Sequence, residues 1–445
     1  LFRSLDLMII VYSPVRSPRL EYVFRLMLTE ILGIEVTMVT DVAVFLSSPS
    51  PKLNYSGDRL GNEPFLRSGN FLFTCAIEIP ELSPVVYKGE TGFFPTSEDS
   101  LLPFDPFASA FLVVSRMEEY LPGKRDRHGR FEGKSSLLFH YGLIEKPVVN
   151  AWANLLAASL LDIYPGMKFF RPKFRSLTTI DIDNAWAYLN KGFARTLAAV
   201  ARDLMKADFK RVKDRLLVLA GKSNDPYDTY DYLFSVLSSK GDDVIFFILT
   251  GNYSRYDKSV PWKNPSFRAL IKKIAENFRV GIHPSYRSSD RQNESLVREE
   301  KERLETVSGL PVTCSRQHYL RLNLPETYRR LMAAGIEEDY SMGFHDLAGF
   351  RAGICTPFKF YDLENEQETL LTVFPFQVMD VSLCQYMKLT VEEAGKKICD
   401  LQEQVRKEGG TFVSIWHNES VTGTDLRKDY LKIFEVMNKG GEIDG

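Results

Sequence analysis

The segment LTTIDID at 177–183 decides the fold of the larger part of this chain. It is a short apolar run that ends in two acidic residues, as expected of a buried strand that leads into a functional loop. Further apolar runs of strand length then alternate with stretches of helix length almost to the end of the chain. This alternation predicts an irregular (β/α) barrel rather than an open sheet. The other expected strands are VIFFILT (244–250), VGIHPS (280–285), VTCSRQH (312–318), a strand near 339–344, LLTVFPF (370–376) and FVSIWH (412–417).

The residues before this segment predict a smaller α/β domain. Pro165, Gly166 and Pro172 break the pattern between the two parts. We therefore expect an N-terminal domain at 1–165 and a barrel at 171–445, with a helical insertion at about 190–240. The N-terminal elements expected are a βαβ unit (LMIIVYS at 7–13, a helix at 18–33, EVTMVT at 35–40), a Pro- and Ser-rich loop at 47–61, and helices near 104–120 and 147–163.

Composition narrows the class of protein. The 445 residues are 44% hydrophobic and 26% charged, with a formal net charge of −2. A chain this close to neutral lacks the positive field that nucleic-acid binding needs, so we expect no nucleic-acid partner. No apolar run approaches the roughly 18–20 residues of a membrane span. The five cysteines form no CxxC pair and no signal peptide is recognisable, which indicates reduced thiols in a cytoplasmic enzyme or binding protein.

Polar residues gather at the carboxyl ends of the expected strands. In barrels of parallel strands the reacting groups lie at these ends. Three of only six histidines, His283, His318 and His417, stand there, together with Asp181 and Asp183. Side chains two residues apart on a strand point to the same side, so the two carboxylates share one face. Carboxylate and imidazole ligands suit Zn²⁺ or a similar first-row ion with an open position for water.

The ordered set TIDID, GIHPSY, SRQHYLR and IWHN resembles a divergent polysaccharide deacetylase of the NodB-homology type, carbohydrate esterase family 4. The resemblance covers roughly 171–440. The stretch 104–131 resembles the N-terminal domain of unknown function found in a Bacteroidetes-type branch of that family. The resemblance implies a distorted (β/α)₇ barrel and metal-dependent removal of acetyl groups from an N-acetylated sugar or glycan, by hydrolysis of an amide C–N bond.

The resemblance also implies roles for individual residues. Asp181 matches the family's general base. The family's ligand Asp corresponds to position 182, where this chain has Ile182, so Asp183 is the nearest acid and is expected to bind the metal. His283 matches the first ligand His. Arg287 stands where the second is expected, and we expect His318 to supply that ligand instead.

The remaining site residues rest on the resemblance for His417 and Arg316, and on sequence position and side-chain chemistry for the others. His417 matches the histidine that protonates the leaving amine. The expected cofactor is a divalent metal, with Zn preferred and Co, Mn or Ni as alternatives. Substrate-binding residues are expected to be Arg316, which replaces the family's motif arginine, with Tyr286, Trp416 and Arg351.

Two other functions remain open from the sequence. Arg287 at a ligand position is compatible with a catalytically inactive glycan-binding protein of the same fold. Asp181 and Asp183 form a DxD, which also occurs in glycosyltransferases, although no Gly-rich phosphate loop stands near it. A DxDxT phosphatase is disfavoured because Ala185 occupies the position that requires a hydroxyl.

Overall fold

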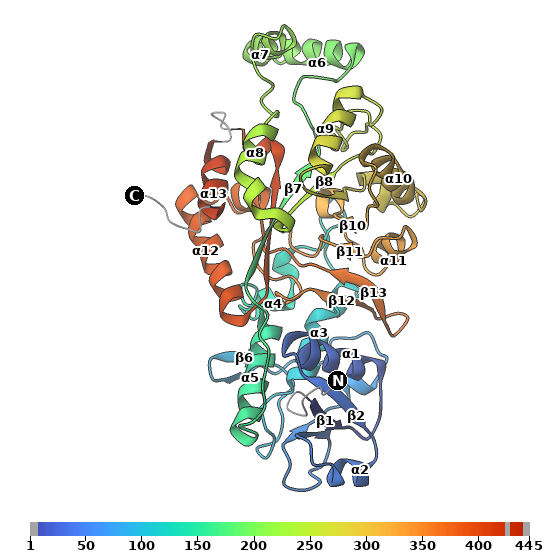
Figure 1. Cartoon of the computed structure of the whole chain (residues 1–445), viewed down its shortest axis with the longest axis vertical. Helices are drawn as coiled ribbons and strands as arrows, with labels where there is room; N and C mark the ends of the chain where they lie inside the picture. Colours follow the sequence, from blue (N-terminus) through green and yellow to red (C-terminus); the bar gives the residue numbers. More distant parts are fainter. Residues whose placement is uncertain (1–7, 423–427, 439–445) are drawn as a thin grey trace.

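The computed structural model describes residues 8–422 and 428–438. The molecule is elongated, with a small sheet at one end, a large sheet in the middle and a helical hairpin at the other end (Figure 1). No helix in these two ranges is long and apolar enough to cross a membrane.

The small sheet has four strands in the order β2-β1-β3-β4, all parallel. The expected parallel pairing of the first two strands is confirmed. The stretch at 47–61, expected to be a loop, contains β3, whose residues are almost all buried. Its strands are β1 (Met8–Tyr12), β2 (Glu35–Val39), β3 (Lys52–Ser56) and β4 (Phe65–Arg67); a separate hairpin joins β5 (Val85–Tyr87) to β6 (Glu90–Gly92).

The large sheet has nine strands in the order β12-β13-β11-β10-β9-β8-β7-β15-β14. Its neighbours pair in parallel except for the antiparallel β12–β13 hairpin. The strand expected at 370–376 overlaps β13, whereas β12 was not expected from the sequence. The strands are β7 (Arg175–Ile182), β8 (Val244–Ile248), β9 (Arg279–Ile282), β10 (Cys314–Ser315), β11 (Glu338–Asp339), β12 (Phe358–Asp362), β13 (Gln367–Val373), β14 (Val378–Met379) and β15 (Thr411–His417).

The large sheet bends round toward its own opposite edge. β13 and β14 lie near opposite ends of the strand order, yet only residues 374–377 separate them in the chain. Four residues span at most about 17 Å between the flanking Cα atoms. The mixed α/β fold with parallel strands is therefore confirmed. The expected closed barrel of seven strands differs from the sheet in the structure. This sheet has nine strands, and within the described ranges its edge strands β12 and β14 do not pair with each other.

Side chains of alternate residues fill the inside and outside of this curled sheet. On β7, Leu177 belongs to the inner apolar cluster, whereas Ile180 and Ile182 belong to the outer one. Asp181 is an even number of residues from Leu177 and points inward with it. The inner cluster also contains Ile245, Phe247, Cys314, Tyr340, Phe376, Val413 and Ile415.

Helices cover the outside of both sheets. The helical insertion expected at about 190–240 is divided into separate helices. One new helix begins after Asp208, whose side chain accepts a hydrogen bond from the backbone amide of Arg211. The helices are α1 (Pro18–Phe24), α2 (Val42–Ser47), α3 (Pro106–Val114), α4 (Leu137–His140), α5 (Val148–Ile163), α6 (Phe193–Met205), α7 (Phe209–Leu219), α8 (Tyr230–Leu237), α9 (Pro265–Ala275), α10 (Leu296–Ser308), α11 (Glu326–Ala333), α12 (Val391–Glu408) and α13 (Lys428–Asn438). The sequence predicts a last helix at 424–438, of which residues 424–427 lie outside the described residues.

Candidate metal centre

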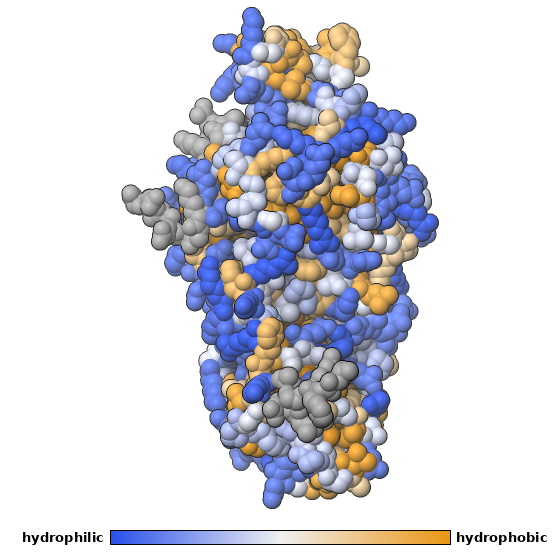
Figure 2. Space-filling model, in the orientation of Figure 1, coloured by the Kyte–Doolittle hydropathy of each residue, from blue (hydrophilic) through white to orange (hydrophobic). Residues whose placement is uncertain are grey.

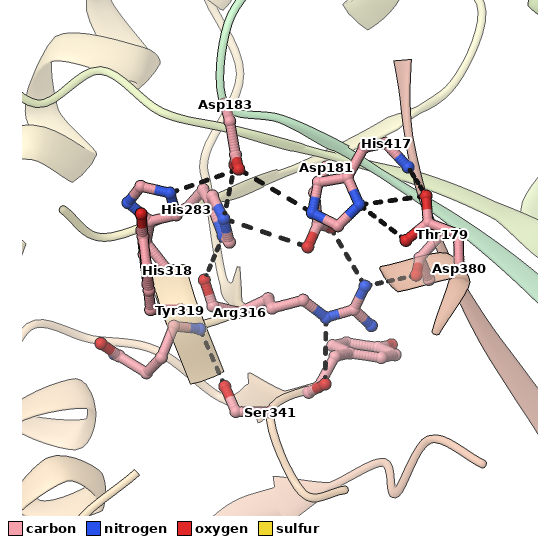
Figure 3. Close-up of polar contacts among 12 residues, drawn as sticks. Thr179, Asp181, Asp183, His283, Arg316, His318, Tyr319, Ser341, Asp380 and His417 are labelled. Carbon is pink, nitrogen blue, oxygen red and sulfur yellow. Dashed lines mark hydrogen bonds and ion pairs between the residues drawn. The ribbon is translucent and has the colours of Figure 1, made fainter. Parts of the chain in front are cut away.

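Asp183 lies between two histidines from neighbouring strands (Figure 3). It follows β7, His283 follows β9, and His318 follows β10 by three residues. One carboxylate oxygen of Asp183 is 3.0 Å from Nε2 of His283, and the other is 3.3 Å from Nε2 of His318. One ligand atom from each of the three residues lies within 4.8 Å of the other two. This is a candidate Asp–His–His metal site.

The second nitrogen of each ring is held by a hydrogen-bond partner. Nδ1 of His283 lies 2.6 Å from the carbonyl oxygen of Arg316, and Nδ1 of His318 lies 2.9 Å from Oδ1 of Asp257. Both partners are acceptors, so each Nδ1 carries the proton. A neutral ring then has a lone pair on Nε2, directed at an Asp183 oxygen that also accepts. At this distance either a proton on Nε2 or a metal ion lies between each ring nitrogen and the carboxylate. The donor set of two imidazoles and a carboxylate fits a first-row divalent ion.

Electrostatics in the cluster agree with a need for positive charge. Burial would raise the pKa of Asp183, but the charge of His318 and hydrogen bonds from both histidines lower that pKa well below its usual value. Burial would lower the pKa of His318, but the carboxylates of Asp183 and Asp257 raise it to about 9. The carboxylates therefore attract one positive charge to this position, whether a proton or a metal ion supplies it.

Asp181 lies beside the cluster and is held by a buried arginine. Its Oδ1 accepts from NH1 of Arg316 at 3.1 Å, while Oδ2 is 3.9 Å from Nε2 of His283. Arg316 is fully buried and also donates to Thr179 and to the carbonyl oxygen of Tyr340. Its guanidinium lies over the Phe247 ring at 4.6 Å. Arg316 thus orients Asp181 from inside the curled sheet and does not reach the open side, where we expected it to bind substrate.

His417 completes the group from the end of β15. Its Nδ1 lies 2.9 Å from Oδ1 of Asp380, and its backbone N–H donates to the same carboxylate. Nε2 is left facing the cluster, 3.8 Å from Oδ2 of Asp183. Burial would lower the pKa of His417, but Asp380 raises it to about 10. In the absence of a metal ion the ring is therefore protonated at neutral pH.

The other predicted contacts differ in position. Trp416 points away from His417, as neighbours on a strand must, and packs against Phe434 of α13 at 5.0 Å between rings. Arg351 is buried in an ion pair with Glu119 and lies outside the cluster. Neither placement supports the expected contact with substrate. The side chain of Arg287 is exposed, so it does not occupy a ligand position.

Tyr286 does lie near the cluster, in a group of aromatic rings. It stacks on Tyr256 at 4.1 Å between ring centroids, and its hydroxyl lies 3.1 Å from Nδ1 of His128. Tyr319, next to His318, contacts the rings of Tyr286, Tyr256 and His128. His128 belongs to the segment before α4, so the N-terminal part of the chain reaches the rim of the large sheet.

Two functional partners were missed in the sequence: Asp257, which holds His318, and Asp380, which holds His417. Asp257 lies in the loop after β8, and Asp380 directly follows β14. Asp380 is also at a strand end, but β14 has only two residues and was not among the expected strands, so the strand-end argument did not reach it. The loop position of Asp257 gives no comparable signal.

A polar cavity of about 870 Å³ lies beyond Tyr319 on the same rim. Its walls include Arg127, Arg130, His345 and Tyr386. Arg130 donates to the carbonyl oxygen of Tyr319 and to the hydroxyl of Tyr386, which connects the cavity wall to the residue beside His318. Burial, together with the charge of Arg130, lowers the pKa of His345 to about 3, so its ring is neutral.

Comparison with known proteins gives one family match by sequence. Residues 9–165 match a family of unknown function, DUF7033. No curated protein matches the chain.

Structural neighbours of the chain include polysaccharide deacetylases. A polysaccharide deacetylase described as putative, from Mycobacterium smegmatis, is 16% identical over 61% of this chain and 85% of its own, with a TM-score of 0.40. The polysaccharide deacetylase of Bacillus cereus is 12% identical over 60% and 86%, with a TM-score of 0.29. A pseudoenzyme of the CE4 family from Bacillus anthracis is 11% identical over 59% and 61%, with a TM-score of 0.26. Identities and TM-scores this low leave the function to be argued from the side chains.

Proposed function

We propose that this protein is a metal-dependent hydrolase that removes acetyl groups from an N-acetylated sugar or glycan. The observation that carries the proposal is the orientation of the two ligand histidines. Both present Nε2 to Asp183 because Nδ1 is held by the carbonyl of Arg316 in one case and by Asp257 in the other. Such a backing acceptor is the usual accompaniment of a metal-ligating histidine.

Asp183, His283 and His318 would hold the metal, with Zn²⁺ as the preferred ion and Co, Mn or Ni as alternatives. A divalent ion bound there would polarise the acetyl carbonyl and lower the pKa of a water molecule. Three protein ligands leave positions open for both, as in catalytic zinc sites.

Asp181 is placed to act as general base. One of its oxygens is occupied by Arg316, and the other faces the cluster. That free oxygen can accept the proton of an attacking water, while the hydrogen bond from Arg316 holds the carboxylate in position. Of the two acids in the DxD, Asp183 alone faces both histidines, which supports separate roles for them.

His417 is placed to act as general acid. Its Nδ1 proton is held by Asp380, and a proton on Nε2 would point at the cluster. When the amide C–N bond breaks, Nε2 can donate that proton to the leaving amine nitrogen. A bound cation would lower the pKa of His417 from its metal-free value and bring it closer to the working pH.

The cavity beyond Tyr319 supports a saccharide as substrate. It combines an aromatic ring, Tyr386, with hydrogen-bonding side chains such as Arg130 and His345. Sugars present both hydroxyl groups and apolar ring faces, and a site of this composition offers partners for each. A sugar unit next to the acetylated one would occupy this cavity.

The test begins with metal analysis of protein purified without added metal. We expect about one divalent ion per chain, lost in His283→Ala and retained in His140→Ala, an exposed histidine on α4. Release of acetate from N-acetylglucosamine oligosaccharides should follow metal content and be abolished by a chelator.

Metal and saccharide binding without acetate release would favour the glycan-binding alternative, and release of UDP from a UDP-sugar would favour the glycosyltransferase. Absence of metal after soaking would overturn the site itself.

A further inference from the structure

The hairpin of α6 and α7 has an unusual distribution of residues. Large apolar side chains are exposed on it: Phe193 is 84% exposed, Met205 81% and Phe209 68%. Globular proteins bury such residues, and a contiguous exposed group of them marks an interaction site. The other exposed apolar residues of the hairpin are Leu197, Leu204, Leu216 and Leu219.

The hairpin buries an ion pair. Asp203 and Arg215 are almost completely buried between the two helices, with Oδ2 and NH2 2.8 Å apart. The guanidinium of Arg215 also lies over the ring of Tyr188 at 4.7 Å. Val218 of α7 is buried beside this pair, but the larger apolar side chains of both helices face outward. The outward face is therefore not explained by packing within this hairpin.

The exposed apolar residues follow helical periodicity. On α6, Phe193, Leu197 and Leu204 are spaced at i, i+4 and i+11, and on α7, Phe209, Leu216 and Leu219 are spaced at i, i+7 and i+10. These spacings give each helix one apolar stripe. Figure 1 places both helices beyond α8 and α9 at the end of the molecule opposite the small sheet, and Figure 2 shows hydrophobic residues bordered by hydrophilic ones there.

The hairpin is basic although the whole chain is slightly acidic. Residues 193–219 contain seven Lys or Arg and three Asp, against a net charge of −2 for all 445 residues. Lys206, Lys210, Arg211 and Lys213 are exposed beside the apolar stripes. A second copy of this chain would bring like charges together at the contact. An anionic lipid surface, by contrast, accepts both the positive charges and the apolar side chains.

We propose that α6 and α7 form a docking surface for an anionic membrane, on which the hairpin lies flat with its apolar stripes in the headgroup region. Helices of 13 and 11 residues are too short to span a bilayer but have the composition of interfacial helices. The hairpin begins ten residues after Asp183. Membrane contact would therefore hold the rim that carries the metal centre near the lipid surface. This inference does not depend on the proposed deacetylation.

Flotation of the full chain with lipid vesicles tests the proposal. We expect binding to vesicles of phosphatidylcholine with about one-third phosphatidylglycerol, no binding to phosphatidylcholine alone, and weaker binding at high salt because the Debye length shortens. Phe193→Ser with Phe209→Ser should weaken binding by about tenfold or more, and Lys206→Glu with Lys210→Glu should do the same. Leu370→Ser is the matched control, since Leu370 is equally exposed on β13.

The outcomes separate the alternatives. Because the substituted side chains are exposed, the variants should keep the wild-type unfolding midpoint, which is measured alongside. Failure of the wild-type chain to float with anionic vesicles would overturn the proposal, as would equal binding by the Phe193→Ser, Phe209→Ser variant. Sedimentation velocity covers the remaining case: a wild-type dimer that becomes monomeric in the serine variant would assign the surface to a second copy and also overturn it.

Discussion

His318 is held between two carboxylates, with Nδ1 2.9 Å from Oδ1 of Asp257 and Nε2 3.3 Å from Oδ2 of Asp183. The first contact fixes the ring and its tautomer, and the second sets where the other nitrogen points. Loss of Asp257 should therefore weaken metal binding although Asp257 is not a ligand. The same arrangement appears at His417, where Asp380 takes the place of Asp257.

Asp257→Asn is expected to lower metal affinity by about 10- to 100-fold. Asn keeps an oxygen that can accept from the Tyr286 amide, but its uncharged side chain no longer favours the Nδ1-protonated ring as strongly. Metal affinity is measured by competition with a chromophoric chelator. Asp231→Asn, which removes an exposed carboxylate on α8, is the control and should bind as the wild type does. Equal affinity in both variants would contradict the role assigned to Asp257.

His417→Ala should separate metal binding from catalysis. His417 is not one of the three converging ligands, so we expect full metal content with acetate release reduced by about 10²–10⁴-fold, the usual contribution of a general acid. Asp380→Asn should have a smaller effect in the same direction. The readouts are metal analysis and kcat. A His417→Ala enzyme that loses its metal would show that His417 is a ligand instead.

Tyr386→Ala should affect long substrates more than short ones. Tyr386 lines the cavity beyond Tyr319 and accepts a hydrogen bond from Arg130, but it does not touch the Asp–His–His cluster. We expect kcat/KM for an N-acetylglucosamine tetramer to fall by about tenfold, a typical loss when an aromatic contact is removed, with little change for the monosaccharide. Tyr253→Ala, at an exposed tyrosine elsewhere, serves as the comparison. Equal losses for both substrates would place the defect at the metal centre.

The candidate site was predictable to the extent that it follows strand ends. Asp181, Asp183, His283 and His417 are at or next to the ends of β7, β9 and β15, and the register of parallel strands brings such ends together. His318 needed only the short extension after β10. The same reasoning should have excluded Trp416 as a substrate-binding residue. Trp416 is next to His417 on the same strand, so its side chain faces the opposite side of the sheet.

Long-range pairings were not predictable. Arg351 forms an ion pair with Glu119, which is 232 residues away in the sequence. Neither local sequence indicates that the other residue is its partner. The strand β3 was not predicted from the sequence, because it has only five residues and is flanked by Pro and Ser. The end of α6 could have been found, since Asp208 is a good N-cap followed by helix-forming residues. The division into two domains at 165 and 171 remains a prediction.

Arg316→Met is expected to destabilise the fold strongly. Arg316 is fully buried and is the cationic partner of Asp181, so the substitution leaves a buried carboxylate without its counter-charge. Removing one member of a buried pair typically costs about 3–5 kcal/mol. Urea unfolding gives the free energy. Arg291→Met breaks an exposed pair with Glu326 and should cost at most about 1 kcal/mol. A second variant, Arg316→Met with Asp181→Asn, should recover part of the loss; no recovery would argue against the pairing as the cause.

Asp105 should make stability depend on pH in the acidic range. It caps α3, accepts from the Tyr55 hydroxyl and two backbone amides, and is almost completely buried. Burial raises its pKa to about 6 against 3.8 for the free side chain. Between these pH values the folded state binds a proton that the unfolded state has released. The free energy of unfolding contributed by Asp105 therefore falls as pH rises from about 4 to 6, by about 3 kcal/mol in all.

Asp105→Asn tests this directly, because Asn can still cap the helix but does not ionise. The free energy of unfolding is measured in urea from about pH 4 to pH 7 for both proteins. The value for the variant minus the value for the wild type should grow with pH, because the variant lacks the contribution that Asp105 loses. Asp41→Asn removes a carboxylate that caps α2 at an exposed position and controls for the loss of charge at a helix start. Parallel wild-type and Asp105→Asn curves would mean that Asp105 titrates alike in the folded and unfolded states. Burial of its carboxylate would then carry no cost at neutral pH.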